Sequence, residues 1–421
     1  YQTSRARAAE REAPRNGEDM NRPQILITHP WMGRGGSEAT AMWTLEALQD
    51  DFEVTFVTAS PMDWEELNGM FGTSVRPEAI RFVRAPRLPT VNSAFRLALL
   101  QGRYFERFCR KMARDFDLCI SAYNPLQFGK PGMQLIGDFS FSEEMRKRLY
   151  IYGDDKFCHR ETPLRKFYLG LVNFVSSQQV PLRERGDLVL ANSEWSAVQL
   201  AEYFEVKDSP VIYPPVVLPS APADSVRDPF GFVCLGRVVP EKEVERIIRI
   251  LERVRGEGYP VTLRLIGELD ESAYSARIRS LVSQHDWITP EGFLQLEAKQ
   301  DILASQTYAL HACRIEAFGI AVAEMASMGC IPIVPKTGGA GEIVPLDELQ
   351  FESDDEACAK IIRLLKRPEL VPDLREKLSS RVSRFGPQVF KEELRGHLQH
   401  FAGLKNPSLH ADSEQNLATA H

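Results

Sequence analysis

Short, β-rich apolar runs alternate along the chain with stretches of helical periodicity. In the first half these runs are QILITH, FEVTFVT, DLCISAY and DLVLANS, at residues 24–29, 52–58, 117–123 and 187–193. A glycine-rich turn follows the first run, and a predicted helix then extends from about Ser37 to Leu48. Strands that alternate with helices are typical of a parallel sheet covered by helices. We therefore predict a doubly wound, Rossmann-like α/β domain over residues 20–210.

A proline-dense segment interrupts this alternation. Five prolines lie within residues 211–230, and such a stretch can continue neither a helix nor a strand, so it is predicted to be a linker. The alternation then restarts, with strands predicted at 231–237, 261–267 and 330–335 and an amphipathic helix at 243–258. These elements predict a second Rossmann-like domain over 231–385, which would face the first across a cleft. A last helix, 388–401 within segment 386–405, is expected to pack back toward the first domain and to form a hinge with the linker.

Composition limits the possible classes of protein. A length of 421 residues suits two domains. The net charge of −7 gives no global attraction to nucleic acid, and no run approaches the roughly 18 apolar residues of a membrane span. Seven scattered cysteines without a CxxC pair predict free thiols in a reducing compartment, so we expect a cytoplasmic protein. Residues 1–19 are interpreted as disordered or as a cloning remnant, and the tail 406–421 as disordered.

The segment EAFGIAVAE, residues 316–324, places two glutamates in an apolar run. A helix is predicted to begin near Phe318, Gly319 and Ile320 without a strong cap, so its free N–H groups could bind an anion such as a pyrophosphate. Glu324 lies inside that helix, where an unpaired carboxylate is costly. Two hydroxyl groups of a ribose could satisfy it. A structural pair with a nearby arginine is an equally good interpretation.

Two further segments are candidates for binding phosphate. GRVVPEK, residues 236–242, follows a predicted strand, and its Arg237 and Lys242 could neutralise a diphosphate leaving group. A solvated basic loop is the simpler alternative. Gly33, Gly35 and Gly36 follow the first strand but miss the dinucleotide-binding spacing, and they could equally form a tight turn.

Taken together, these segments resemble the retaining glycosyltransferases of family 4 (group 1), which have the GT-B fold. The resemblance covers nearly all of residues 24–385 and is stronger in the second half. It is carried by GRGGSEAT after the first strand, LANSEWSA at 190–197, VIYPPV at 211–216, LGRVVPEK at 235–242, and the E-x7-E block that continues into GCIPIVPKTGGAGEIV at 329–344.

The resemblance implies a role for each candidate residue. Glu316 would face the sugar of a nucleotide-diphosphate donor, and Glu324 would hold the ribose. Arg237 and Lys242 would grip the diphosphate, together with backbone N–H groups at Phe318, Gly319 and Ile320. Gly35 and Gly36 would lie across the cleft, near the donor phosphates. The chemistry would retain anomeric configuration and need no metal ion, because cations and helix dipoles stabilise the leaving group.

Two segments depart from the family pattern. Many relatives carry a histidine in an N-domain loop that faces the sugar, whereas the comparable stretch here, 134–141, offers Asp138. Asp138 is a candidate for sugar or acceptor contact, with loop capping as the alternative. His311 and Arg314 stand where relatives often have smaller polar residues. Arg314 could shape sugar choice or simply pair with Glu316.

The sequence says less about where an acceptor would bind. Ten Lys or Arg residues face only Glu78 and Glu106 between residues 76 and 114, within which 95–116 mixes aromatic and basic residues at helical spacing. This stretch could contact anionic lipid at the inner membrane face or a phosphate-bearing acceptor. It could also be an ordinary amphipathic helix with solvated charges. No nucleic-acid-binding motif is present.

The sequence thus predicts a hexosyl- or related glycosyltransferase that uses a nucleotide-diphosphate sugar. The acceptor would be a glycan, a lipid-linked molecule or a small molecule. The alternatives are a GT-B nucleotide-sugar epimerase and a non-catalytic subunit that binds a nucleotide sugar.

Overall fold

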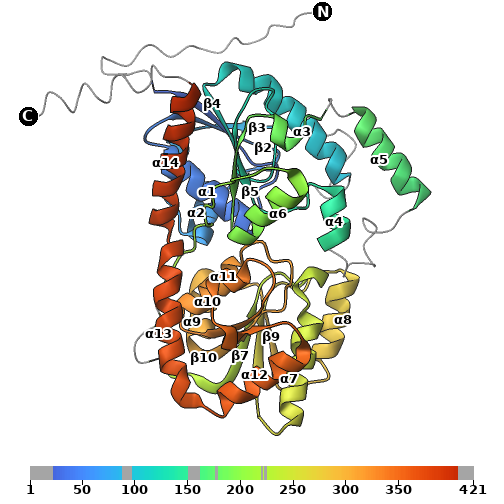
Figure 1. The fold of residues 1–421 in the computed structure, drawn as a ribbon, viewed down its shortest axis with the longest axis vertical. Helices are drawn as coiled ribbons and strands as arrows, with labels where there is room; N and C mark the ends of the chain where they lie inside the picture. Colours follow the sequence, from blue (N-terminus) through green and yellow to red (C-terminus); the bar gives the residue numbers. More distant parts are fainter. Residues whose placement is uncertain are drawn as a thin grey trace, which may run out of the picture.

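The computed structural model describes residues 22–87, 97–149, 162–175, 179–219, 221 and 225–405. It contains two α/β domains, one above the other in Figure 1, and each is built on a six-stranded sheet. The predicted disordered ends, 1–19 and 406–421, and residues 88–96 of the basic segment lie outside the described residues.

The N-terminal sheet is parallel and has the strand order β3-β2-β1-β4-β5-β6. Its strands are β1 (Gln24–Thr28), β2 (Glu53–Thr58), β3 (Ile80–Arg84), β4 (Leu118–Ser121), β5 (Met133–Ile136) and β6 (Leu188–Ala191). The helices of this domain are α1 (Gly36–Leu48), α2 (Trp64–Phe71), α3 (Ala98–Met112), α4 (Glu143–Leu149), α5 (Pro163–Val175) and α6 (Glu194–Phe204). Strands β1 and β4 are buried at all but one position, which explains their continuous apolar sequence.

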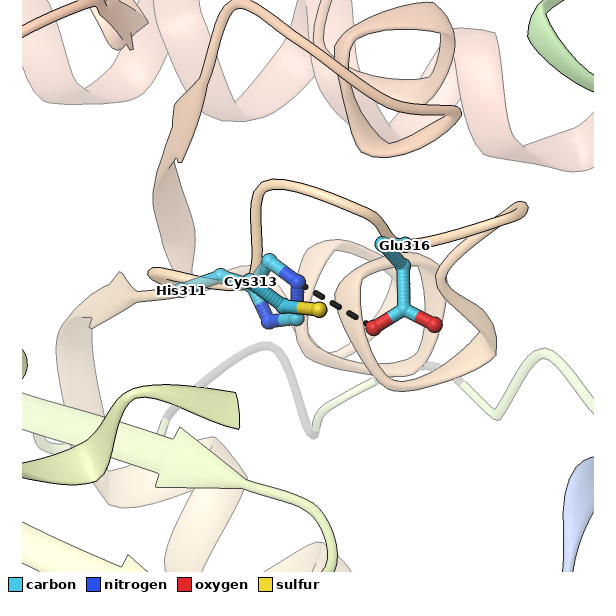
Figure 2. A group of neighbouring side chains, drawn as sticks. All are labelled: His311, Cys313 and Glu316. Atoms are coloured by element: carbon cyan, nitrogen blue, oxygen red, sulfur yellow. Dashed lines mark ion pairs between the residues drawn. The ribbon is translucent and has the colours of Figure 1, made fainter. Parts of the chain in front are cut away.

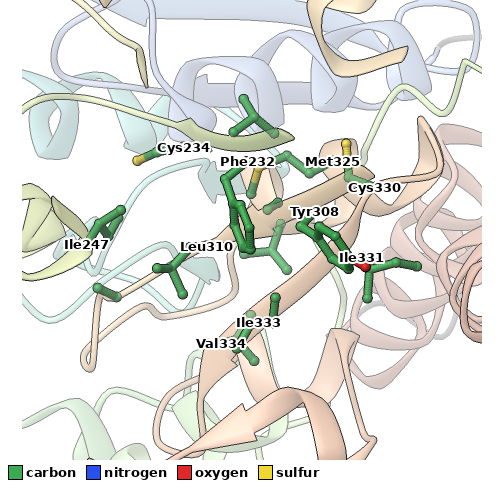
Figure 3. Packing of buried hydrophobic residues seen from close by; sticks show 14 of the residues in the cluster. Phe232, Cys234, Ile247, Tyr308, Leu310, Met325, Cys330, Ile331, Ile333 and Val334 are labelled. Carbon is green, nitrogen blue, oxygen red and sulfur yellow. The ribbon is translucent and has the colours of Figure 1, made fainter. Parts of the chain in front are cut away.

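The C-terminal sheet repeats the same topology, with the order β12-β11-β10-β7-β8-β9. Its strands are β7 (Asp228–Leu235), β8 (Thr262–Ile266), β9 (Ile288–Gly292), β10 (Gln306–Leu310), β11 (Ile331–Pro335) and β12 (Gln350–Phe351). Its helices are α7 (Val244–Gly256), α8 (Ala273–Val282), α9 (Leu296–Ser305), α10 (Ile320–Ser327), α11 (Ala340–Ile343), α12 (Asp354–Leu365) and α13 (Val371–Val382). Figure 3 shows part of the core, where the rings of Phe232 and Tyr308 stack with centroids 5.1 Å apart.

Strand β7 begins earlier than the sequence predicts. The linker was expected to reach residue 230, but Asp228 already pairs with β10. Thr262 Oγ1 donates a hydrogen bond to Asp228 Oδ2 at 2.9 Å, and Thr307 Oγ1 donates to its carbonyl oxygen at 2.6 Å. Pro229 is tolerated because it lies near the start of the strand.

The strand order places a ligand crevice in each domain. In both sheets the order reverses between the first and the fourth strand, β1 and β4 in one and β7 and β10 in the other. Ligands of open α/β sheets bind outside the carboxyl ends of the strands at this switch point. The two-domain fold predicted from the sequence is confirmed, and it directs attention to the loops after β1, β7 and β10.

The last helix, α14 (Pro387–Lys405), joins the two domains. It leaves the C-terminal domain after α13 and runs along one side of the N-terminal domain (Figure 1). Its buried residues Phe390, Leu394, Leu398 and Phe401 belong to the N-terminal core. Lys391 Nζ also donates to Glu46 Oε1 of α1 at 2.9 Å. Helix α14 therefore packs on the N-terminal domain.

Truncation of this contact should destabilise the N-terminal domain. Leu394 is fully buried, so we expect Leu394→Ala to cost about 2–5 kcal/mol of unfolding free energy. Gln399→Ala, at an exposed position of the same helix, is the matched control and should change little. Urea-induced unfolding of both variants tests this expectation. Equal stability of the two variants would show that α14 contributes little to the core.

Candidate functional site

Two loops of the C-terminal domain bring the candidate residues together. Strand β7 ends at Leu235, and a 3-10 turn, Pro240–Lys242, then presents Lys242 at the crevice. Strand β10 ends at Leu310, and the loop that follows carries Glu316 to the start of α10. Because β7 and β10 are neighbours at the switch point, residues 74 positions apart in the sequence meet in space.

Two side chains approach one oxygen of Glu316. Lys242 Nζ donates a hydrogen bond to Oε2, and His311 Nε2 lies 3.3 Å from the same atom (Figure 2). The side chains of Lys242 and Glu316 are 22% and 17% exposed, so the pair lies at the edge of the solvent. Burial alone would raise the pKa of Glu316, but Lys242 and His311 outweigh it and hold that pKa well below the usual range. Burial likewise lowers the pKa of Lys242, and the Glu316 carboxylate reverses this and raises it.

His311, Cys313 and Glu316 are residue types that can ligate a metal ion. One potential ligand atom from each lies within 4.8 Å of the others, and Figure 2 shows the three side chains converging. Their present chemistry does not favour a metal ion as ligand. Burial raises the pKa of the Cys313 thiol to about 12, and the thiolate is the form that binds metals. The Lys242 ammonium group already occupies the Glu316 carboxylate.

The start of α10 has the features of an anion site. Its N-cap residue, Gly319, has a φ of 106°. No side chain caps this end of the helix, and the first turn holds no acidic residue. A backbone hydrogen bond fixes the loop before α10: Gly339 N donates to Glu316 O at 2.7 Å. A Cβ atom at Gly338 would lie 2.9 Å from the same carbonyl oxygen, so this approach requires glycine. A helix start of this kind leaves backbone N–H groups that can bind an anion.

The glycine-rich loop of the N-terminal domain reaches this helix. A Cβ atom at Gly36 would lie 2.7 Å from Cδ1 of Ile320, so the Ile320 side chain packs directly on this glycine across the cleft. Gly35 caps α1 in an extended conformation. Next to it, the Arg34 guanidinium lies 4.9 Å from the ring centroid of Phe293 in the other domain. Arg237 is exposed in the same loop as Lys242, and its charge opposes the rise in the pKa of Lys242.

The two domains are also linked by capping contacts at α6. Ser193, its N-cap residue, is fully buried and donates a hydrogen bond to the carbonyl oxygen of Ala317. The Glu342 carboxylate accepts from the backbone N–H groups of Glu194 and Trp195 at 3.0 and 2.7 Å. A carboxylate at a helix N-terminus is favourable. Sequence reasoning missed both roles, although Ser193 and Glu342 lie within the quoted segments LANSEWSA and GAGEIV.

Glu324 is half-buried and paired. Lys299 Nζ donates to Oε1 and Oε2 at 3.1 and 3.0 Å. The structural alternative was an arginine partner, and the observed partner is a lysine from α9. A diol would therefore share the carboxylate with Lys299, and the ribose contact stays a prediction.

Asp138 lies in the N-terminal domain and is surrounded by donors. Tyr123 OH donates to Oδ2 at 2.9 Å, and Asn124 Nδ2 donates to Oδ1 at 2.7 Å. The N–H and hydroxyl groups of Ser140 donate to Oδ1 at 2.9 and 2.7 Å. Four such bonds favour the loop-capping interpretation of this residue.

Two histidines near the crevice have no assigned part in the sequence prediction. His311 contacts Glu316, as described above. His29, at the carboxyl end of β1, is buried, and burial lowers its pKa to about 4, so its ring is neutral at physiological pH. Its ring lies 5.2 Å from that of Tyr123. A histidine directly after the first strand is a signal that could have been noticed.

Arg314 does not pair with Glu316. Its Nε and Nη2 atoms lie 3.0 and 2.8 Å from Oε1 of Glu243. The suggested Arg314–Glu316 pair is therefore wrong, because Lys242 and His311 already occupy the Glu316 carboxylate.

Comparison with known proteins agrees with this geometry. Residues 222–383, which include both crevice loops of the C-terminal domain, match the family model of group 1 glycosyl transferases. This segment is therefore similar to the group 1 glycosyl transferases. The gpi3 subunit of a phosphatidylinositol N-acetylglucosaminyltransferase from Schizosaccharomyces pombe is 24% identical over 135 residues, which are 32% of this chain. The match spans only 30% of that relative's length.

Solved structures share the whole two-domain fold. Sucrose-phosphate synthase from Thermosynechococcus elongatus has a TM-score of 0.67 at 16% identity, over 91% of this chain and 100% of the other. Anabaena HepE in complex with UDP-glucose has a TM-score of 0.63 at 16% identity, over 90% of this chain and 100% of the other. WaaG, a glycosyltransferase involved in lipopolysaccharide biosynthesis, has a TM-score of 0.62 at 13% identity, over 90% and 99%. The chain has the GT-B fold.

Removal of Lys242 should lower the free energy of unfolding, because the Glu316 carboxylate then loses its ammonium partner. In Lys242→Met, only His311 would still oppose the burial that raises the pKa of Glu316, so this pKa should rise. Since both groups are partly exposed, we expect a loss of up to about 3 kcal/mol of unfolding free energy at pH 7.

The pH dependence distinguishes this cause from lost packing. As the pH falls, Glu316 of the variant should take up a proton first and regain stability, whereas the wild-type protein loses the benefit of its low pKa. The difference between the two proteins should therefore shrink toward low pH. Urea-induced unfolding from pH 8 to pH 4 measures it, with Lys377→Met, at an exposed Lys–Asp pair, as the control. A difference that does not depend on pH would contradict the assignment.

Proposed function

We propose that this protein is a retaining glycosyltransferase that uses a nucleotide-diphosphate sugar as its donor. The observation that carries the proposal is the Lys242–Glu316 pair beside the uncapped start of α10, opposite the glycine-rich loop of the other domain. The Lys242 ammonium group meets the carboxylate beside a helix start that suits an anion, at the strand-end position that α/β folds use for nucleotides. A UDP-sugar is the first donor to test, because HepE was solved with UDP-glucose.

The site suggests how transfer would proceed. Lys242, Arg237 and the N–H groups at Phe318, Gly319 and Ile320 would bind the diphosphate and stabilise its charge as the bond to the sugar breaks. Glu316 would face the sugar ring and offer its second oxygen, Oε1, since Lys242 and His311 converge on Oε2. The leaving phosphate would take the proton of the acceptor hydroxyl group. This scheme requires no metal ion, and that independence remains a prediction.

The acceptor would be a glycan, a lipid-linked molecule or a small molecule. The similarity to a subunit whose name includes phosphatidylinositol, and to WaaG of lipopolysaccharide biosynthesis, supports a lipid-linked acceptor. An epimerase and a non-catalytic binding subunit remain the rivals. They differ in products: an epimerase converts the donor without acceptor, and a binding subunit forms no product.

A donor screen followed by product analysis tests the proposal. Thermal shifts with UDP, GDP, ADP, TDP and their sugars should reveal one responder, since a ligand at 100 times its Kd adds about 2.7 kcal/mol of stability. With that donor and candidate acceptors, transfer should occur with retained anomeric configuration. Glu316→Gln should lower kcat by about 10²-fold or more, as loss of a group that acts on the transition state does. Full activity of this variant would rule out the role given to Glu316.

We further propose that the protein contacts anionic membranes through α3 and its neighbours. Within the described residues, no helix is long and apolar enough to span a bilayer. Some charges of the basic segment are engaged in the fold, since Arg76 pairs with Asp50 and Arg87 donates to Ala59 O. One face of α3 stays exposed and carries Tyr104, Arg107 and Lys111. Beside it, α5 carries Lys166 and Phe167, the latter 72% exposed. Such a surface suits a peripheral protein on the cytoplasmic leaflet.

Charge reversal on α3 tests this contact. Arg107→Glu/Lys111→Glu should abolish co-sedimentation with vesicles that contain phosphatidylserine, since each basic residue contributes about 1 kcal/mol near such a surface. Arg249→Glu/Lys377→Glu changes the net charge equally on the other domain and should bind like wild type. Equal loss in both variants would indicate a non-specific charge effect. No binding by the wild-type protein would exclude the contact.

A further inference from the structure

Glu243 has an unusual backbone conformation directly beside the site. It follows Lys242 and joins the turn Pro240–Lys242 to α7, with φ at 50° and ψ at 42°. This left-handed conformation costs free energy for any residue with a Cβ atom, and glycine is the usual occupant. The residue is also only 8% exposed. A buried charged side chain at a position that favours glycine needs a compensating function.

The side chain of Glu243 links its own turn to the loop after β10 and to α7, and through Arg246 to α12. Its Oε1 atom accepts from Nε and Nη2 of Arg314, in the loop that carries Glu316. Its Oε2 atom lies 3.3 Å from Nη1 of Arg246 on α7. Arg246 in turn donates from Nε to Asp354 Oδ1 at 2.5 Å, at the start of α12, and its guanidinium lies 5.1 Å from the ring centroid of Phe351. The two loops of the crevice are thus tied to each other and to the helical layer behind them.

We propose that Glu243 is a positioning residue of the donor site, which holds Lys242 against Glu316 by fixing the turn before α7 to the loop after β10. The proposal rests on the proposed function only for its catalytic consequence. Glu243 itself does not contact Lys242 or Glu316 through its side chain; it acts through the backbone of its neighbour and through Arg314. A small shift of Lys242 is enough to matter, since a misplacement of about 1 Å can cost about 10²-fold in rate.

A purely structural ion pair is the alternative, and a second glutamate in the chain provides the control. Glu205 caps the end of α6 with a φ of 54°, and its carboxylate lies 2.8 Å from Arg183. It therefore has the same backbone strain and an arginine partner. Its side chain is 67% exposed, whereas that of Glu243 is 7% exposed. Replacement of either residue by glycine relieves the strain and removes the pair, so both variants are expected to fold.

The first readout is the position of Lys242, which requires no activity. In crystal structures of the Glu243→Gly variant and of the wild-type protein, Lys242 Nζ should be hydrogen-bonded to Glu316 only in the wild type. In the Glu205→Gly variant the bond should be present. A retained Lys242–Glu316 bond in Glu243→Gly would overturn the inference whatever the activity.

The second readout is kinetic. With the donor identified as above, Glu243→Gly should lower kcat by about 10–100-fold with a much smaller change in the KM for donor, while Glu205→Gly should match the wild type. Arg314→Ala should cause a similar loss, and the double variant should be no worse than either single variant, because the two residues act as one unit. Additive losses, or wild-type kcat in Glu243→Gly, would contradict the proposal. If the wild-type protein transfers no sugar, the proposed function fails, and the crystallographic readout still decides the role of Glu243.

Discussion

A charged carboxylate at the edge of an apolar crevice must be balanced, and much of the C-terminal domain is arranged to do so. Glu316 receives Lys242 from one loop and His311 from its own. Lys242 can reach it because β7 and β10 lie side by side, so the turn after β7 faces the loop after β10. The carbonyl oxygen of Glu316 is engaged as well, by Gly339 N, so backbone and side chain are both fixed. The pair therefore ties the strand order of the sheet to the geometry of the site.

The same loop also joins the two domains. Ala317, next to Glu316, accepts from Ser193 of the N-terminal domain, and Ile320 at the start of α10 abuts Gly36. Phe318 packs against Tyr213 of the linker, with ring centroids 5.5 Å apart, and against Phe385 before α14. The chain passes between the domains at the linker and again before α14. Both passages thus contact the segment that would hold the donor. A rotation of one domain on the other would move this segment directly, because the segment contacts both domains.

Asp138 and Glu324 carry carboxylates that could bind a ligand, but both form hydrogen bonds with protein groups. Asp138 has four protein donors around its carboxylate, which leaves little capacity for a ligand. Glu324 shares its two oxygens with Lys299 but remains half-buried at the surface of α9 and α10. Of the two, Glu324 can accept further hydrogen bonds without loss of a structural contact, because a carboxylate has about four lone-pair sites.

The sequence by itself determined the two-domain α/β fold, since apolar runs, helical periodicity and the proline-dense linker are local signals that survive without tertiary contacts. It also singled out Glu316, Arg237, Lys242 and the start of α10, because these residues lie at strand ends and a helix start that local patterns reveal. The partners were decided only by the tertiary structure. That Glu316 pairs with Lys242 and His311, that Arg314 binds Glu243, and that Glu342 caps a helix of the other domain all depend on strand order and domain packing. Side chains dozens of residues apart meet through the register of the sheet, which a single sequence does not encode in any local pattern.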